Sequence, residues 1–171
     1  MRAAAVAPRR KQLAPAVLAR RLAGLRRRGL RVVFTNGCFD LLHAGHVRYL
    51  ERARRLGDLL VVGVNTDASV RRLKGVGRPI LPLSERAAVL GALSAVDFVV
   101  AFGDDSPERL IRLVRPDVLV KGADWPLARI AGGREVQARG GRVRRIALQS
   151  PFSTSRIIRR IQSFHPRRRA R

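Results

Sequence analysis

Short apolar runs alternate along the chain with longer segments in which apolar residues recur every three or four positions. The short runs predict strands and the periodic segments predict helices. The predicted helices cover residues 13–28, 46–56, 84–93, 107–114, 135–139 and 154–163. The predicted strands cover residues 30–35, 59–64, 98–101, 118–120 and 143–148. Strands and helices in alternation predict an α/β fold, with about five parallel strands in one doubly wound sheet and helices on both faces.

The length of 171 residues fits one domain. We expect this domain to span residues 13–163, between a basic N-terminal tail at 1–12 and a basic C-terminal tail at 164–171. Segments rich in Gly and Pro connect the predicted elements, and several of them lie at the side of the sheet where α/β proteins bind ligands.

The chain is strongly basic, with 36 Lys and Arg residues against 12 Asp and Glu residues. Residues 1–31 hold 10 of the basic residues and residues 136–171 hold 11, and neither flank contains an acid. In the middle of the chain, the numbers of basic and acidic residues are therefore nearly equal. Solvated flanks and a polyanion-binding role both explain this distribution. We do not expect nucleic acid as the main partner, because aromatic residues for base stacking are scarce in the flanks.

A single cysteine, Cys38, excludes an intramolecular disulfide and a four-cysteine zinc site. No apolar stretch approaches the roughly 20 residues that a membrane helix requires. The first residues carry charge where a secretory signal would be apolar. These features predict a cytoplasmic protein without a membrane partner.

The segment between the first predicted strand and its helix carries the candidate chemistry. Gly37 allows close backbone approach, and the N-terminus of the following helix favours an anion. His43 and His46 are three residues apart with only Ala44 and Gly45 between them, which leaves room for a phosphate chain. Packing histidines and metal-binding histidines are the alternatives, although only one further histidine is present.

The motif His43-Ala-Gly-His46 resembles the signature of the His-x-Gly-His nucleotidyltransferases. Among these, the heptose 1-phosphate adenylyltransferases share further segments: TNGCFD at 35–40, VNTD at 64–67, RLKG at 72–75, RP at 78–79, VKGADW at 120–125 and STSRII at 153–158. The resemblance covers about residues 14–163 and implies a Rossmann-like nucleotidyltransferase fold. It is closest to the stand-alone form of these enzymes, because nothing similar to a sugar kinase precedes it. The last motif departs from the Ser-Thr-Thr-like pattern we expect.

The resemblance also implies roles for individual residues. His43 and His46 would act on the α-phosphoryl group, and Lys74 would contact phosphate in or near the sugar phosphate site. The residues implied in nucleotide binding are Asn36, Gly37, Cys38, Phe39, Asn65, Lys121, Gly122, Asp124, Ser153, Thr154 and Ser155. Surface lysines and a simple helix cap are the alternatives for the lysines and the hydroxyl cluster. Mg²⁺ is expected with ATP, and we assign it no protein ligand.

The expected reaction transfers AMP from ATP to D-glycero-β-D-manno-heptose 1-phosphate, giving ADP-heptose and pyrophosphate for lipopolysaccharide core synthesis. The attacking phosphate is already anionic at pH 7, because the second pKa of a phosphate monoester is about 6, so no general base is required. A cytidylyltransferase acting on glycerol 3-phosphate or a similar alcohol phosphate is the alternative. The resemblance also allows a homodimer.

Overall fold

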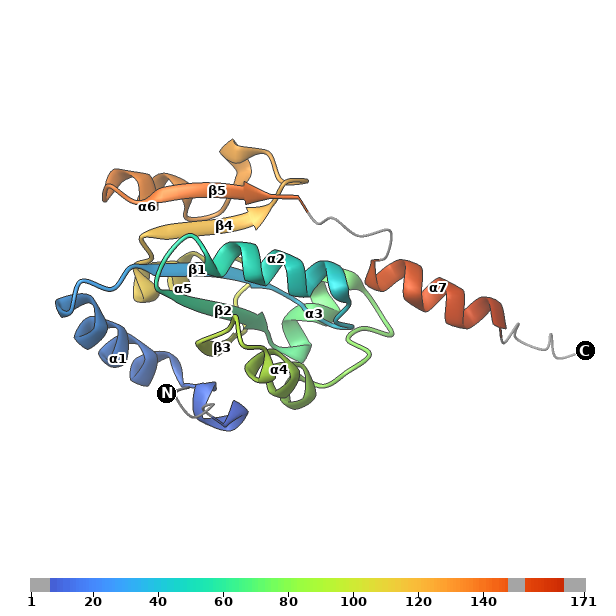
Figure 1. The fold of residues 1–171 in the computed structure, drawn as a ribbon. Helices are drawn as coiled ribbons and strands as arrows, with labels where there is room; N and C mark the ends of the chain where they lie inside the picture. Colours follow the sequence, from blue (N-terminus) through green and yellow to red (C-terminus); the bar gives the residue numbers. More distant parts are fainter. Residues whose placement is uncertain (1–6, 148–152, 165–171) are drawn as a thin grey trace, which may run out of the picture.

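The computed structural model describes residues 7–147 and 153–164. Its centre is a sheet of five strands in the order β3-β2-β1-β4-β5, with every neighbouring pair parallel. The strands are β1 (Val32–Gly37), β2 (Leu59–Asn65), β3 (Phe98–Phe102), β4 (Val118–Gly122) and β5 (Arg142–Ile146). This arrangement confirms the predicted doubly wound α/β fold (Figure 1).

The helices are α1 (Pro15–Arg27), α2 (Ala44–Arg54), α3 (Asp67–Lys74), α4 (Leu83–Ala92), α5 (Glu108–Val114), α6 (Gly133–Ala138) and α7 (Thr154–Phe164), with short 3-10 helices η1 (Pro8–Lys11) and η2 (Leu127–Arg129). The sequence pattern did not predict α3. That helix is only eight residues long and mostly exposed, so it has few apolar positions to mark it. Its start is set by Thr66, whose hydroxyl accepts a hydrogen bond from the Ser69 amide.

Two hydrophobic cores lie on opposite faces of the sheet. Helices α2 and α4 pack on one face against alternate strand residues such as Val33 and Val62. Helices α1, α5 and α6 cover the other face, where Phe34 and Val61 are buried. The alternation along each strand follows from successive side chains pointing to opposite faces. Both faces are covered, as expected of a parallel sheet (Figure 1).

The segment just before α1 is bound to the domain, although the sequence assigned it to the basic N-terminal tail. The Lys11 ammonium donates to the carbonyls of Leu93 and Val96, at 3.1 and 2.7 Å. A Cβ on Gly91 of α4 would lie 2.8 Å from the Pro8 carbonyl, so the chain needs glycine here to let η1 approach. Residues 8–12 therefore pack against the end of α4.

The strand order places the change of winding direction between β1 and β4. In open α/β sheets, ligands bind outside the carboxyl ends of the strands at such a point. The β1–α2 loop, residues 38–43, leaves the sheet there. None of the helices in the described ranges is long and apolar enough to cross a bilayer.

Candidate active site

The β1–α2 loop brings two histidines to the first turn of α2. Phe39 has a φ of +46°, a left-handed conformation that reverses the chain just after the strand. His43 is the N-cap of α2, and its Nδ1 accepts a hydrogen bond of 3.1 Å from the Gly45 amide. The helix begins two residues earlier than the sequence predicted, so His46 lies inside its first turn.

The two imidazoles lie against each other. Their ring centroids are 4.0 Å apart at an interplanar angle of 39°, and the Phe39 ring meets His46 edge-on at 5.6 Å. Burial, together with the neighbouring His43 ring, lowers the pKa of His46 to about 4. Burial also lowers the pKa of His43. At pH 7 the pair is therefore neutral, and it carries N–H donors without a net charge.

One polar atom of this pair lacks a partner. His46 Nδ1 is buried and makes no hydrogen bond within the described residues. An orphaned buried N–H is rarer in proteins than an under-satisfied acceptor. This asymmetry favours the tautomer with the proton on Nε2. The cap hydrogen bond on Nδ1 of His43 imposes the same tautomer on that ring.

Lys121 lies at the point where the winding direction changes. It follows the buried part of β4, and its ammonium donates to Asn36 Oδ1 on β1 at 2.7 Å. The ammonium also lies 5.7 Å from the centroid of the Trp125 ring. Burial lowers the pKa of Lys121 to about 8, against an opposing effect of Asp124. A desolvated cation at the strand ends gains more than a solvated one from binding an anion.

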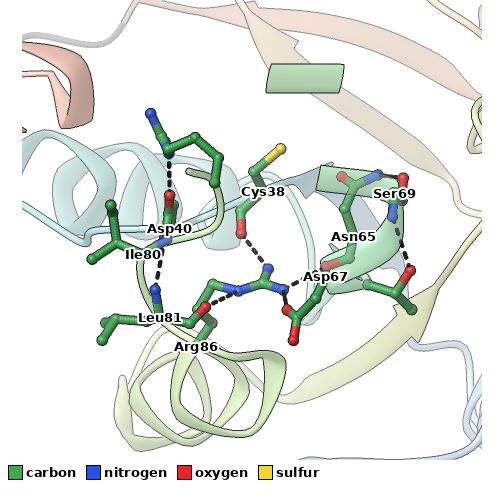
Figure 2. Close-up of polar contacts among 10 residues, drawn as sticks. Cys38, Asp40, Asn65, Asp67, Ser69, Ile80, Leu81 and Arg86 are labelled. Atoms are coloured by element: carbon green, nitrogen blue, oxygen red, sulfur yellow. Dashed lines mark hydrogen bonds and ion pairs between the residues drawn. The ribbon is translucent and has the colours of Figure 1, made fainter. Parts of the chain in front are cut away.

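A buried arginine connects the loops around the site, as Figure 2 shows. Arg86, on α4, donates to the carbonyls of Leu81, Cys38 and Asn65 at 3.0, 2.6 and 2.8 Å. It also bonds the Asp67 carboxylate at 2.7 Å. These acceptors come from the 75–82 loop, the β1–α2 loop, the end of β2 and the start of α3. Arg86 therefore fixes the relative positions of four segments.

Asp40 holds the 75–82 loop from the other side. Its buried carboxylate pairs with Arg78 and accepts the backbone amides of Ile80 and Leu81 at 2.7 and 3.1 Å (Figure 2). These contacts give it a structural role. Because its oxygens are engaged in this way, Asp40 is poorly placed to act as a base or a metal ligand.

The other residues singled out in the sequence lie around the same loops. Asn65, at the end of β2, donates to Ser69 Oγ at 2.9 Å. Lys74, the last residue of α3, is exposed and close enough to Cys38 to oppose the rise in thiol pKa that burial causes. Asp124 is exposed in the loop after β4, which ends at Gly122.

The hydroxyl cluster begins α7. Thr154 Oγ1 donates to the Leu41 carbonyl of the β1–α2 loop at 3.1 Å. Ser153 Oγ accepts the Arg156 amide at 3.2 Å, as a helix cap does. Ser155 is exposed in the first turn. The start of α7 therefore meets the loop that carries the histidines.

Sequence reasoning missed Arg86. The signal was present, because Arg86 is four residues before Leu90 on α4 and shares the buried face with Ala87 and Leu90. An arginine on an apolar helix face needs acceptors within the fold. Nothing in the sequence identified those acceptors, since three of them are backbone carbonyls.

Within residues 7–147 and 153–164, no three His, Cys, Asp or Glu side chains come together as a metal site would require.

Comparison with known proteins agrees with this geometry. The family model described as cytidylyltransferase-like matches residues 34–160. The bifunctional protein HldE of Citrifermentans bemidjiense is 56% identical over 86% of this chain, and that of Pseudomonas aeruginosa LESB58 is 58% identical over 80%. The chain spans about 30% of the length of these relatives.

A solved structure also matches. The lipopolysaccharide core biosynthesis protein from Thermoplasma volcanium GSS1 superposes with a TM-score of 0.60 at 29% identity, covering 70% of this chain and 98% of that one. The family model covers most of the chain, and the matched residues 34–160 include the histidine pair of the first βα loop. The chain therefore belongs to the cytidylyltransferase-like family of nucleotidyltransferases.

Proposed function

We propose that the chain transfers AMP from ATP to D-glycero-β-D-manno-heptose 1-phosphate, releasing pyrophosphate and forming ADP-heptose. The observation that carries the proposal is the neutral pair His43 and His46 at the N-terminus of α2, beside the strand ends that hold Lys121. The sugar is proposed from the motifs RLKG at 72–75 and VKGADW at 120–125.

The relatives support the choice of substrate. Those of C. bemidjiense and P. aeruginosa are named bifunctional, and this chain matches about 30% of each, as expected of one catalytic part of a two-activity protein. The T. volcanium protein is titled a lipopolysaccharide core biosynthesis protein. That title agrees with a sugar precursor of the lipopolysaccharide core as the product.

The histidine pair would act on the α-phosphoryl group. With Nδ1 of His43 occupied by the Gly45 amide, its Nε2–H is the donor available to a phosphate oxygen. His46, neutral at pH 7, would contribute a second N–H without repelling the first ring. Two donors held in place before the reaction stabilise charge that develops in the transition state.

Positive potential near the histidines would bind the triphosphate. The N-terminus of α2 carries the positive end of the helix dipole. Lys121 would add a full charge, worth up to about 4 kcal/mol for an anion at 4 Å in a medium of effective dielectric 20. The backbone at residues 36–39 and Asn65 would contact the nucleotide, while Asp124 and Gly122 would line the same end of the sheet.

The acceptor needs orientation rather than deprotonation. A sugar phosphate attacks as an anion, so the site must align two anions and neutralise their repulsion. Lys74, at the end of α3, would hold the sugar phosphate. Ser153, Thr154 and Ser155 would reach the β- and γ-phosphates from the start of α7. Mg²⁺ bound to the nucleotide would supply further charge neutralisation on the departing pyrophosphate.

The deciding experiment measures pyrophosphate release by the purified protein with magnesium, offering ATP or CTP with heptose 1-phosphate or glycerol 3-phosphate. Release with ATP and heptose 1-phosphate alone is the expected result. Release with CTP and glycerol 3-phosphate would keep the chemistry and overturn the substrates. No release with any pair would overturn the proposal entirely.

A further inference from the structure

Helix α7 presents an apolar face that the domain leaves uncovered. Ile161 is 56% exposed and Phe164 is 68% exposed, while Ile157 and Ile158 are half-buried. Ile161 follows the two isoleucines by four and three positions, and Phe164 follows Ile161 by three, so these residues share one side of the helix. No residue of α7 is buried. Figure 1 shows the helix extending beyond the N-terminal end of α2 and away from the sheet.

The remaining surface of α7 is positively charged. Arg159 is exposed on the side opposite Ile161. Arg160, also exposed, flanks the apolar face, and its guanidinium lies 5.9 Å from the centroid of the Phe164 ring. The sequence from 156 to 171 contains seven arginines and no acid. A short helix with bulky apolar residues on one side and a cluster of basic residues on the other is typical of segments that lie on anionic bilayers.

Although the sequence predicted no membrane partner, we propose that α7 docks on an anionic phospholipid surface, with Ile161 and Phe164 inserted between the acyl chains and the arginines at the headgroups. The helix is 11 residues, or about 16 Å, long. This is far too short to span a bilayer, so it would lie in the interface. The docked helix would hold the catalytic domain at a membrane surface.

Charge complementarity favours an anionic bilayer, rather than a second copy of the chain, as the surface that covers α7. Two copies of α7 packed through their apolar faces would bring arginines toward arginines, with no acidic residue on either helix to compensate. The chain as a whole carries a formal charge of +24, which also opposes self-association. An anionic bilayer supplies both the negative charge and the apolar layer directly beneath it.

The residues proposed to enter the bilayer, Ile161 and Phe164, are separate from the proposed catalytic residues. Thr154 ties the first turn of α7 to the β1–α2 loop, whereas Ile161 and Phe164 lie in its second half. Substitutions at these two positions therefore test docking without altering the hydroxyl cluster. The proposal does not depend on which nucleotide or sugar the enzyme uses.

The test is co-sedimentation of the full chain with vesicles of phosphatidylcholine alone or with about 30% phosphatidylserine, which gives the vesicle the negative surface potential that attracts basic segments. We expect the mixed vesicles to bind at least tenfold more protein. The double variant I161D/F164D should lose at least tenfold of this binding. V89D, which places an acid at an exposed apolar position of α4, should retain it.

A second pair of variants separates specific docking from general attraction of a basic chain. R159E/R160E should lose binding, whereas R20E/R27E on α1, with the same change of charge, should retain most of it. Equal losses in both pairs, or undiminished binding by I161D/F164D, would overturn the proposal. So would a lipid-free dimer that I161D/F164D converts to monomer without any vesicle binding. Pyrophosphate release by I161D/F164D without vesicles reports separately on the proposed function.

Discussion

His43 combines a structural contact with a proposed catalytic one. Its Nδ1 caps α2 by accepting the Gly45 amide, and its other nitrogen is the proposed phosphate donor. Asparagine is among the best N-cap residues, because its side-chain oxygen accepts the same backbone hydrogen bond. The two contacts can therefore be separated by choosing between two substitutions.

His43→Asn should keep the stability of the wild type and lose the imidazole. We expect turnover to fall about 100- to 1000-fold, the usual effect of removing one preorganised donor. His43→Ala should show the same loss of turnover and in addition lower the free energy of unfolding by about 1 kcal/mol. Urea denaturation and pyrophosphate release measure the two effects. Turnover of His43→Asn within tenfold of wild type would contradict the role.

Lys121 gives the enzyme a predicted pH dependence. Its pKa of about 8 means that the ammonium is mostly charged at pH 7 and loses its proton as the pH rises through about 8. The kcat/KM for the nucleotide should therefore decline above that pH. Arginine keeps its charge throughout this pH range. The Lys121→Arg variant should therefore not show the decline of kcat/KM above pH 8, even with a lower maximum rate. An unchanged decline of kcat/KM in this variant would show that the titration of another group causes it.

At the scale of elements, Arg86 shows how one helix positions several loops. Because α4 buries this guanidinium with four acceptors, the 75–82 loop, the β1–α2 loop, β2 and α3 meet at one point. Removing the guanidinium would leave the buried Asn65 carbonyl without this donor, and three part-buried acceptors would lose it as well. The cost of such orphaned groups makes this junction rigid.

Arg86→Lys should destabilise the fold although it keeps the charge. A lysine ammonium has three donors on one atom and cannot reach acceptors arranged around a planar guanidinium. We expect the free energy of unfolding to fall by about 3 kcal/mol, as when a buried ion pair is broken. The control Arg109→Lys, in an exposed pair with Asp104, should change it by less than about 1 kcal/mol. Equal effects in the two variants would contradict the positioning role.

Helix α3 shows where local pattern falls short. Polar residues dominate it, so it lacks the apolar stripe by which longer helices are found. The closing helix was predicted from its isoleucines, while α3 was missed. The difference lies in the number of apolar positions that repeat at helical spacing.

At the scale of the whole molecule, the N-terminal segment closes the edge of the domain. Lys11 binds two carbonyls at the end of α4, and Gln12 forms an isolated parallel bridge with Val99 on the edge strand β3. The backbone of Leu13 also donates to the Val99 carbonyl at 3.0 Å. This segment shields part of an otherwise open strand edge.

Lys11→Met should therefore lower the free energy of unfolding by about 1–3 kcal/mol, because two part-buried carbonyls lose a charged donor. Arg10→Met, at an exposed position in the same 3-10 helix, is the matched control and should change it by less than about 0.5 kcal/mol. Urea titration of both variants makes the comparison. A Lys11→Met variant as stable as its control would show that the segment is only loosely held.

The sequence by itself determined the alternation of strands and helices, the fold class and the loop that carries the histidines, because periodicity and glycine placement are local properties. Only the tertiary structure decided the strand order. That order brings Lys121 to Asn36 across 85 residues and surrounds Arg86 with its acceptors. Such contacts join distant segments, and a charged residue can be buried only where the fold supplies partners. The membership in a nucleotidyltransferase family follows from both levels, while the assignment of each site residue stays a prediction for the experiments above.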